Sequence, residues 1–417
     1  MKKIVAFFLA VLMIATLAAC GQNKPSNSVV EIEFYMQNEA EVEIFEKIVS
    51  DFNASHSDIK VTLVNLPEEE SGNVLNTRIQ NNDSPDIYND WFSQDVFNKV
   101  DAGAVLDMTG SKYCSYINDD VLAQTAYNGK NYMIPMTCNF MGVYYNVDMF
   151  NEYGIEVPKT LDEFWEVCET LKAKGVTPIS AGDKDGWNLA HWVQDVIGVY
   201  MPNYSADFLK IYDGSMTFAD AEGISDVADV VINRTKYAQD GCLGDGTSEM
   251  ISHFANKEAA MMINGSWQMA TLNAANLDFE YAAFPFPAKN EADTTVMSNA
   301  DFSFVLSAQS SAEKQEAAKT FLEYMLTEGV KYYIDQTGAP SAVKAVKSDT
   351  SRYSAIVPYL ESGKIFRMPY SGRWTDDTYL DYTVALQNLV DSSNKEKFYK
   401  EFTDALLVSG KPATYVD

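Results

Sequence analysis

Histidine and cysteine, the side chains that most often bind transition metals, are scarce in this sequence. The 417 residues include three histidines and five cysteines, and the histidines lie far apart, without the spacing of a zinc site. Four cysteines follow the N-terminal region, at Cys114, Cys138, Cys168 and Cys242, with no C-x-x-C pair. We expect free thiols, although four cysteines would also allow three disulfide pairings. No metal site and no cofactor is predicted.

Positive charge is also in short supply. Lysine and arginine total 31 against 59 acidic residues, which gives a net charge of −28. Such a surface argues against binding nucleic acid, anionic lipid headgroups or a polyanionic ligand. The glycine-rich phosphate loop, the G-x-S-x-G elbow and the H-E-x-x-H metal motif are missing as well. Asp183–Gly186 resembles the start of a calcium loop but lacks its later ligands, so we interpret it as a turn.

Long hydrophobic runs are limited to the N-terminus. Two lysines precede an apolar run over residues 4–15, which is shorter than the roughly 20 residues that span a bilayer. This order is typical of a secretory signal. Leu17–Cys20 (LAAC) resembles a bacterial lipobox, which predicts a signal peptide over 1–19, a lipidated Cys20 and a flexible tether over 20–28. The predicted location is the extracellular face of a bacterial cell membrane; an ordinary signal peptide with a chance cysteine is the alternative.

The rest of the sequence has the composition of a folded α/β protein with two domains. It is too long for one hydrophobic core. Hydrophobic periodicity predicts, in order, strand 30–36, helix 39–53, strand 60–66, helix 69–80 and strand 86–88. This alternation indicates a parallel sheet. Ligands of such sheets bind beyond the carboxyl ends of the strands, which here are residues 37–39 and 89–91.

Capping signals indicate further helices. A strand is predicted over 143–145, and Thr160–Glu163 is a capping box for a helix that should end at Gly175. A second capping box at Ser310–Glu313 predicts a helix that should end at Gly329.

Aromatic residues beside short polar residues are the most informative content of the chain. Aromatics make up 12% of the residues, with 24 tyrosines and six tryptophans. Four tryptophans occur in the contexts Asp90-Trp91, Gly186-Trp187, Gly265-Ser266-Trp267 and Arg373-Trp374. An aromatic plate can cover the C–H face of a sugar ring, while polar side chains bind its hydroxyls. The alternative is that these tryptophans fill the core. We expect a core position for Trp165 and leave Trp192 open.

The chain resembles the extracellular solute-binding proteins of bacterial carbohydrate ABC transporters, the family similar to maltose-binding protein. The matching segments extend from one end of the mature chain to the other. They are Pro85–Tyr88, Ala102–Thr109, Gly129–Pro135 with Tyr145-Asn146, Gly154–Phe164, Phe254–Met261 leading to Gly265–Trp267, Phe284–Pro287 and Gln336–Pro340.

This resemblance implies a two-lobe periplasmic-binding-protein-like fold with three interlobe crossovers and a hinge near Thr137–Asn139. The implied N-terminal lobe comprises residues 29–138 and 302–352, and the C-terminal lobe comprises 139–301 and 353–417. It also implies a ligand site without catalytic residues. The ligand-binding candidates are Gln37, Asn38, Glu39, Asp90, Trp91, Asn139, Trp187, Trp267, Asn299, Asp301, Arg373 and Trp374.

The expected function is capture of a neutral sugar between the lobes and its delivery to the ABC permease in the membrane, by a protein that is a monomer and not an enzyme. Several aromatic candidates from both lobes favour an oligosaccharide, with α-glucosides or α-galactosides as the first guess. A lipid-anchored glycoside hydrolase is the alternative from another class, because chance carboxylate pairs are expected among so many acidic residues. The same fold binding a peptide or polyamine is another alternative.

Overall fold

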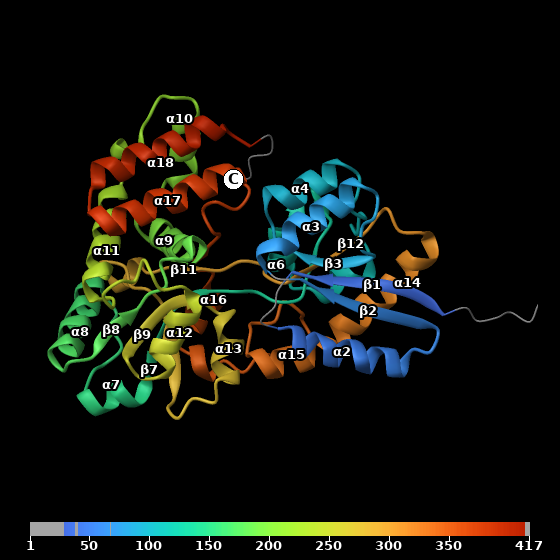
Figure 1. Cartoon of the computed structure of the whole chain (residues 1–417), viewed down its shortest axis with the longest axis horizontal. Coiled ribbons are helices and arrows are strands. Elements are labelled where there is room, and N and C mark those ends of the chain that lie inside the picture. Colours follow the sequence, from blue (N-terminus) through green and yellow to red (C-terminus); the bar gives the residue numbers. More distant parts are fainter. Residues whose placement is uncertain (1–28, 38–40, 67, 413–417) are drawn as a thin grey trace, which may run out of the picture.

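The computed structural model describes residues 29–37, 41–66 and 68–412. It has two α/β lobes that lie side by side and are joined by the chain segments between them (Figure 1). Each lobe has its own β-sheet, with helices on both faces and its own hydrophobic clusters. Two cores are expected for a chain of this length, because single cores stop growing at about 250–300 residues.

The N-terminal lobe has a five-stranded sheet in the order β2-β1-β3-β12-β6. Strand β1 (Val30–Met36) runs parallel to β2 (Ile59–Asn65) and β3 (Ile87–Asp90). The connections are helices α2 (Val42–Ser55) and α3 (Glu68–Gln80), so the predicted alternation is confirmed. Helix α2 starts three residues later than expected and buries Phe45, Ile48, Val49 and Phe52. Strands β12 (Ser303–Leu306) and β6 (Ile134–Pro135) return from later in the chain, each antiparallel to its neighbour.

Helices cover both faces of this sheet (Figure 1). Helix α2 shares a core with α14 (Ala312–Tyr324) and α15 (Val330–Thr337) on one face, and α3 shares one with α4 (Gln94–Asp101) on the other. The remaining helices of this lobe are α5 (Lys112–Tyr116) and α6 (Asp119–Gln124), and a small ladder pairs β4 (Ala126–Tyr127) with β5 (Lys130–Asn131).

Two predicted helix boundaries in this lobe are wrong. The N-cap of α14 is Ser311, whose hydroxyl accepts a hydrogen bond from the Lys314 amide, whereas the Ser310 hydroxyl donates to Asp86. Gly329 does not end the helix, because a π-helical turn over Met325–Gly329 leads directly into α15. The chain stops at Gly338, which has a left-handed φ of 74° that favours glycine.

The C-terminal lobe has a four-stranded sheet in the order β10-β7-β9-β8. Its strands are β10 (Tyr281–Phe284), β7 (Met141–Asn146), β9 (Ala259–Gly265) and β8 (Thr177–Ser180). Only β8 and β9 run parallel. Its helices are α7 (Val147–Tyr153), α8 (Leu161–Ala173), α9 (Gly186–Tyr200), α10 (Tyr204–Tyr212), α11 (Ile224–Tyr237), α12 (Thr247–Ala255), α13 (Gln268–Ala274), α16 (Val357–Ser362), α17 (Asp376–Ser392) and α18 (Lys395–Ser409), with short 3-10 turns at Phe218–Asp220, Glu291–Asp293 and Ser351–Tyr353.

In this lobe, local sequence signals correctly predicted the start of a helix and a structural turn. The capping box at Thr160 and Glu163 is present at the start of α8, and Gly175 follows that helix with a φ of 79°. Both carboxylate oxygens of Asp183 bind the Arg234 guanidinium at 2.6 Å, in agreement with a structural turn at this position. That guanidinium also lies 4.6 Å from the ring of Trp192, which is buried in the core.

Three stretches of chain connect the lobes. The first lies between β6 and β7, and the second between β11 (Val296–Met297), which pairs with β13 (Ile365–Phe366), and β12. The third leaves the N-terminal core after Val343 and joins the C-terminal core at Tyr353. Antiparallel bridges join Thr137 to Ser341 and Cys138 to Ala300, so the crossing segments lie against one another at the predicted hinge.

The structure also bears on the expected free thiols and on membrane-spanning helices. Cys114, Cys138, Cys168 and Cys242 are all free thiols, and only Cys138 is not fully buried. Among the helices of the described residues, none combines the length and the apolar character that a bilayer crossing requires.

Candidate ligand-binding cleft

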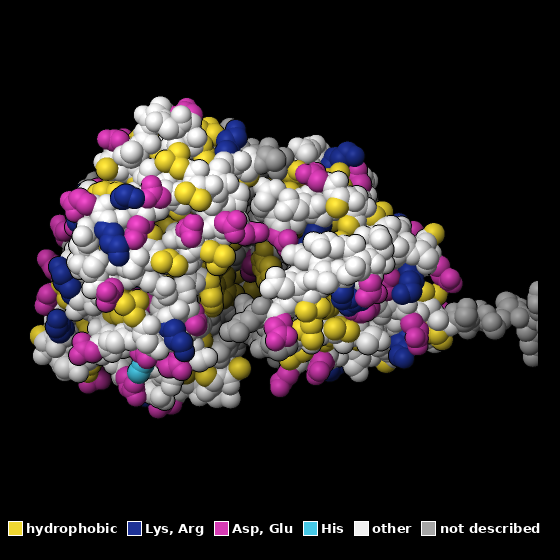
Figure 2. All heavy atoms as spheres, turned by 45° about the horizontal axis from the view of Figure 1, so that its top comes forward, with side chains coloured by type: hydrophobic (Ala, Val, Ile, Leu, Met, Phe, Trp, Pro, Cys, Tyr) yellow, Lys and Arg dark blue, Asp and Glu magenta, His cyan; other side chains and the backbone are white. Residues whose placement is uncertain are grey.

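A hollow lined partly by hydrophobic side chains separates the two lobes on the face shown in Figure 2. The carboxyl ends of β1 and β3 belong to the N-terminal lobe, and the segment after β9 meets the hinge, where the Ser266 amide donates to the Phe140 carbonyl at 2.9 Å. Strand ends of this kind are where open α/β sheets bind ligands. We therefore locate each predicted site residue relative to these strand ends.

Trp91 is the exposed plate of the N-terminal wall. It directly follows β3, and 37% of its surface is exposed. Asp90 stabilises this turn. Its Oδ1 accepts a hydrogen bond from the Trp91 amide at 2.9 Å, and its Oδ2 lies 2.6 Å from the Lys99 ammonium. Asp90 is only 3% exposed, so the structure shows it as a support for this turn, and direct contact of its carboxylate with ligand stays a prediction. Both oxygens are already used to position Trp91.

Gln37 also lies behind the surface of the cleft. Its backbone amide donates to the Asn89 side chain, and its own amide donates to the Asn89 carbonyl, both at 2.7 Å. Gln37 is 5% exposed and ties the end of β1 to β3. The structure shows Gln37 in a supporting position, and its contact with ligand stays a prediction. The neighbouring candidates Asn38 and Glu39 lie outside the described residues.

The hinge segments bring three predicted polar residues together, Asn139, Asn299 and Asp301, which we call the polar floor of the cleft. The Asn139 side-chain oxygen accepts from the Asn299 backbone at 3.0 Å, and Asp301 forms hydrogen bonds with the side chains of Asn139 and Trp91. Burial raises the pKa of Asp301 to about 6, although these hydrogen bonds oppose the shift. The floor thus links the N-terminal plate to both crossing segments. Direct ligand contact by these three residues stays a prediction.

A second buried acid lies near Asp301. Glu41 precedes α2, is 4% exposed and accepts a hydrogen bond from the Tyr333 hydroxyl at 2.6 Å. Burial raises the pKa of Glu41 to about 7, and the charge of Asp301 adds to this effect. Sequence patterns gave no signal for this pair, because Glu41 precedes α2 whereas Tyr333 lies on α15, and the two meet only in the fold.

The C-terminal wall is an aromatic cluster centred on His191. The ring centroid of His191 is 5.7 Å from that of Trp187, 5.6 Å from Trp267, 6.2 Å from Tyr370 and 6.1 Å from Tyr379. The cluster therefore includes two predicted residues, Trp187 and Trp267, both of which are partly exposed. It also includes His191, Tyr370 and Tyr379, which were not predicted as ligand-binding residues.

The protonation of His191 follows from its neighbours. Its Nδ1 lies 2.7 Å from the Trp187 carbonyl, an acceptor, so Nδ1 carries a hydrogen. Burial lowers the pKa of His191, which favours the neutral ring. Neutral His191 therefore presents Nε2 as a hydrogen-bond acceptor.

The Gly265-Ser266-Trp267 motif has a direct steric explanation. A Cβ atom at Gly265 would come within 2.1 Å of the Trp267 ring, so glycine lets the indole lie flat over the backbone. The Ser266 hydroxyl accepts the Phe140 amide at 3.2 Å and fixes the turn to the hinge. Sequence reasoning identified the motif, and the structure explains its glycine.

The predictions for Trp374 and Arg373 require correction. Trp374 is 2% exposed and packs against Phe208, Tyr382 and Phe402 at centroid distances of 4.9–5.3 Å, so it is a core residue and not a plate. Arg373 is 4% exposed, and its guanidinium donates to the carbonyls of Pro369 and Ser371. Arg373 thus holds the turn that carries Tyr370. The polar residues around Trp374 belong to the start of α17 and do not surround its ring.

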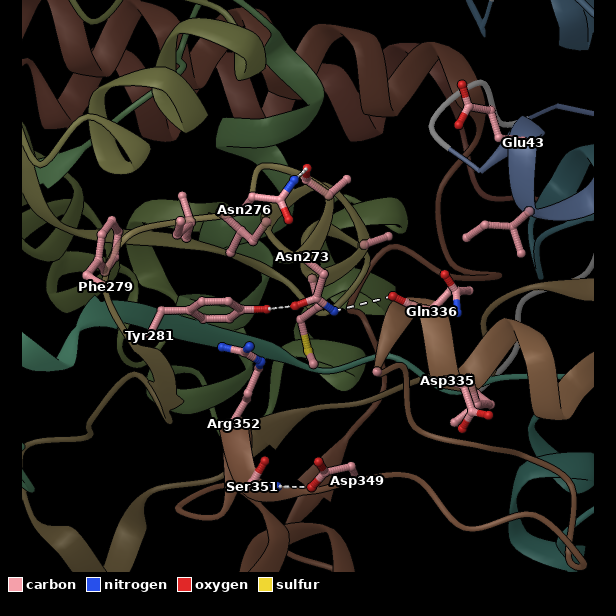
Figure 3. Close-up of a pocket in the computed structure, with 18 of the residues that line it drawn as sticks. Glu43, Asn273, Asn276, Phe279, Tyr281, Asp335, Gln336, Asp349, Ser351 and Arg352 are labelled. Atoms are coloured by element: carbon pink, nitrogen blue, oxygen red, sulfur yellow. Dashed lines mark hydrogen bonds between the residues drawn. The ribbon is translucent and has the colours of Figure 1, made fainter.

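A separate cavity of about 960 Å³ lies along the lower edge of the molecule in Figure 1, between α13 and helices α2 and α15. Figure 3 shows Asn273 at its centre, accepting from the Tyr281 hydroxyl at 2.7 Å and donating to the Gln336 carbonyl at 3.4 Å. Arg352 lies over the Tyr281 ring. Of the predicted site residues that the structure describes, none lines this cavity. We assign the ligand site to the cleft, where strand ends and exposed rings converge.

Metal binding has no support within the described ranges, where no group of three or more histidine, cysteine or acidic side chains is arranged to hold an ion.

Comparison with known proteins identifies the family. The model of the bacterial extracellular solute-binding proteins matches residues 47–356. This chain belongs to that family. Among curated proteins, a multiple sugar-binding protein of Streptococcus mutans is 31% identical over 84% of each chain. The melibiose/raffinose/stachyose-binding protein MelE of Bacillus subtilis is 22% identical over 84% of this chain and 83% of its own length.

Solved structures of solute-binding proteins share the fold. RafE in complex with raffinose is 26% identical, with a TM-score of 0.82 over 91% of this chain and 99% of that chain. The apo form of RafE from Streptococcus pneumoniae has a TM-score of 0.78 over 93% and 100% of the two chains. The predicted two-lobe periplasmic-binding-protein-like fold is therefore confirmed.

Family membership settles two further expectations. Extracellular solute-binding proteins bind solutes and catalyse no reaction, so the chain is a binding protein and not an enzyme. The extracellular location is confirmed in the same way. The lipobox cysteine Cys20 lies outside the described residues, so lipid anchoring stays a prediction.

Proposed function

We propose that this protein captures a neutral oligosaccharide in the cleft between its lobes and delivers it to an ABC permease. The observation that carries the proposal is the pairing of aromatic surface and polar floor: Trp91 on one wall, the ring cluster around His191 on the other, and Asn139, Asn299 and Asp301 between them. Rings cover the apolar faces of sugars, and the floor can bind their hydroxyls.

The relatives narrow the class of sugar. The name of MelE gives melibiose, raffinose and stachyose as its ligands, and RafE was solved with raffinose. Each of these sugars contains an α-linked galactose. Of the two expected classes, we therefore propose an α-galactoside.

Closure of the lobes would couple binding to transport. A ligand that contacts Trp91 and Trp267 touches both lobes, so it binds the closed form better than the open form. A buried hydroxyl left without a partner costs about 1–3 kcal/mol, which gives specificity to a site with a polar floor. The permease would recognise the closed form.

The anchor belongs to the same proposal. Lipidation at Cys20 and the polar tether that follows would keep the protein on the extracellular face of the membrane, near its permease. A Cys20→Ser variant tests this: it should be released or left unprocessed, whereas normal processing and retention would contradict lipid anchoring.

Titration calorimetry of the mature protein tests the ligand. Raffinose, stachyose and melibiose should bind with micromolar or lower Kd, while maltotriose, a short peptide and spermidine serve as competitors from other classes. Tight binding of spermidine or the peptide alone would contradict a sugar ligand. Chromatography of the sugars after prolonged incubation checks for hydrolysis, and any shortened product would overturn the assignment as a pure binding protein.

A further inference from the structure

Arg367 is a cation without an acidic partner in a strongly acidic protein. It forms no ion pair with any carboxylate of the described residues, although the chain carries a net charge of −28. Its guanidinium instead donates to the Ala123 carbonyl at 3.3 Å and lies 5.7 Å from the centroid of the Phe92 ring. Both contacts are with the N-terminal lobe, whereas Arg367 belongs to the C-terminal lobe.

The backbone of Arg367 is firmly fixed to its own lobe. It directly follows β13, whose residue Phe366 packs so closely on α9 that a Cβ at Gly198 would lie 1.8 Å from its ring. The Arg367 carbonyl accepts from the Tyr204 hydroxyl at 3.3 Å, and the next amide, of Met368, donates to the Asn299 side chain at 2.9 Å. Arg367 therefore moves with the C-terminal lobe when the lobes rotate.

The acceptors are fixed just as firmly to the other lobe. Ala123 is near the end of α6, and the carbonyl of the adjacent Leu122 accepts from the Asn131 side chain of the same lobe at 3.3 Å. Phe92 directly follows the exposed plate Trp91 and packs edge-on against Phe97 of α4 at 4.8 Å. One side chain thus spans the cleft between two segments that hold the N-terminal wall.

We propose that Arg367 is an interlobe clasp that stabilises the closed, sugar-bound state and slows release of the sugar. The proposal rests on the proposed function. A guanidinium can donate to a carbonyl and stack on a ring at the same time, which a lysine ammonium cannot reproduce. Because the clasp joins the two lobes, we expect it to act on dissociation of the sugar and not on encounter.

The surroundings of Arg367 support a contact that depends on closure. Burial lowers its pKa, and the nearby charge of Arg373 acts in the same direction. The Arg367 side chain is partly exposed, and its contacts with the other lobe are the hydrogen bond to Ala123 and the ring of Phe92. Separation of the lobes would return the guanidinium to water and remove both contacts.

Stopped-flow binding of raffinose to the mature protein tests the clasp. Arg367→Ala should raise the dissociation rate constant about tenfold and leave the association rate constant within twofold of the parent. Arg367→Lys should recover only part of this effect, and Phe92→Leu should reproduce part of it. The matched control is Lys364→Ala, which removes an equal charge from a side chain whose one bond among the described residues is to the Ala292 carbonyl of its own lobe.

The outcomes separate the clasp from its alternatives. Thermal melting of the unliganded variants shows whether Arg367→Ala still folds. If it does not fold, the dissociation rates of Arg367→Lys and Phe92→Leu are compared with that of the parent instead. An unchanged dissociation rate in these variants would overturn the clasp, as would a slowed association alone, which would indicate electrostatic steering. If the parent protein binds none of the sugars, the proposed function and the clasp are both overturned. If the parent binds sugar and the variants release it at the same rate as the parent, only the clasp is overturned.

Discussion

On the N-terminal wall of the cleft a single indole, Trp91, is exposed, whereas on the C-terminal wall Trp187, Trp267 and Tyr370 each contact the ring of His191. The N-terminal plate is held by polar groups: the buried Asp90–Lys99 ion pair fixes its backbone. Ring packing holds the C-terminal wall. The two walls therefore depend on different interactions, which single substitutions can separate.

The two walls also show that the exposed fraction of a tryptophan side chain, and not the residue type, separates a ring that can stack on a sugar from a ring that fills the core. Trp267 and Trp374 both follow polar turns, yet only Trp267 is partly exposed.

Trp374→Ala should lower the stability of the unliganded protein by about 3–5 kcal/mol, because it removes a ring packed among Phe208, Tyr382 and Phe402. Urea melts of the unliganded protein measure this loss. Trp165→Ala is the control, since Trp165 is only partly buried at the edge of the same core and should cost less. A stable Trp374→Ala variant with weakened sugar binding would restore Trp374 as a plate.

Lys99→Met should cost about 3 kcal/mol, because it leaves Asp90 as a buried carboxylate without its ammonium partner. The double variant with Asp90→Asn should recover most of this loss, since it removes the stranded charge as well. Urea melts give both values, and Lys319→Met in a surface i,i+3 pair with Glu316 serves as control. Equal stabilities for the single and double variants would show that the pair does not hold the N-terminal wall.

Stability of the unliganded protein should fall as the pH rises from about 5 to 8. The pKa of Glu41 is raised to about 7 from an ordinary value of 4.5, so the folded state holds a proton that the unfolded state has lost across this window. Ionisation above pH 7 then carries the full cost of burying the charge. Asp301, with a pKa of about 6, acts in the same direction.

The variant Glu41→Gln isolates the share of that residue in the pH effect. It keeps an acceptor for the Tyr333 hydroxyl but cannot ionise, so its stability should change less between pH 5 and 8 than that of the parent, by on the order of 2 kcal/mol. Melting temperatures at the two pH values measure the difference. An identical pH dependence in parent and variant would contradict a raised pKa at Glu41.

Sequence patterns predicted the fold far better than they predicted the cleft. Strands such as β1 and helices such as α2 have local periodicity that is read directly from the chain. The π-helical turn before α15 has no such signal, because Gly329 is tolerated inside a helix that packing continues on both sides. The local sequence pattern therefore predicts whether a segment is a helix or a strand more reliably than it predicts the residue at which that segment ends.

Within the cleft, residues carried by a motif were predicted and residues brought together by packing were not. Trp267 follows a glycine that its ring requires, and this signal is local. Trp374 was misjudged because its ring contacts come from α10 and α18, far from it in sequence. Tyr370 and Tyr379 are two of 24 tyrosines, and no neighbouring residue distinguishes them.

Trp267→Ala should weaken sugar binding by about 2 kcal/mol, roughly 30-fold, because it removes the apolar face that covers a sugar ring. Stability of the unliganded protein should change far less than in Trp374→Ala, since the Trp267 ring is partly exposed and lies over Gly265. Calorimetry and urea melts on both variants compare the two tryptophans directly. Parent-like affinity in Trp267→Ala would remove this residue from the C-terminal wall.

Asp376→Asn should tighten sugar binding by about two- to threefold, the smallest effect of the set. Asp376 begins α17 in the C-terminal lobe, and its pKa is raised by burial and then by acids that include Asp95 of the N-terminal lobe, an effect that the charge of Lys99 only partly opposes. Like charges that face each other across the cleft oppose closure, so neutralising one favours the closed form.

The size and salt dependence of the Asp376→Asn effect identify its origin. It should shrink at high salt, because repulsion between partly exposed charges is screened over about 8 Å at physiological ionic strength. Asp391→Asn, at the other end of α17, makes the same charge change away from the cleft and should leave affinity unchanged. Weaker binding in Asp376→Asn would mean that this carboxylate bonds the sugar itself, and the C-terminal wall would then combine rings with a polar contact as the N-terminal wall does.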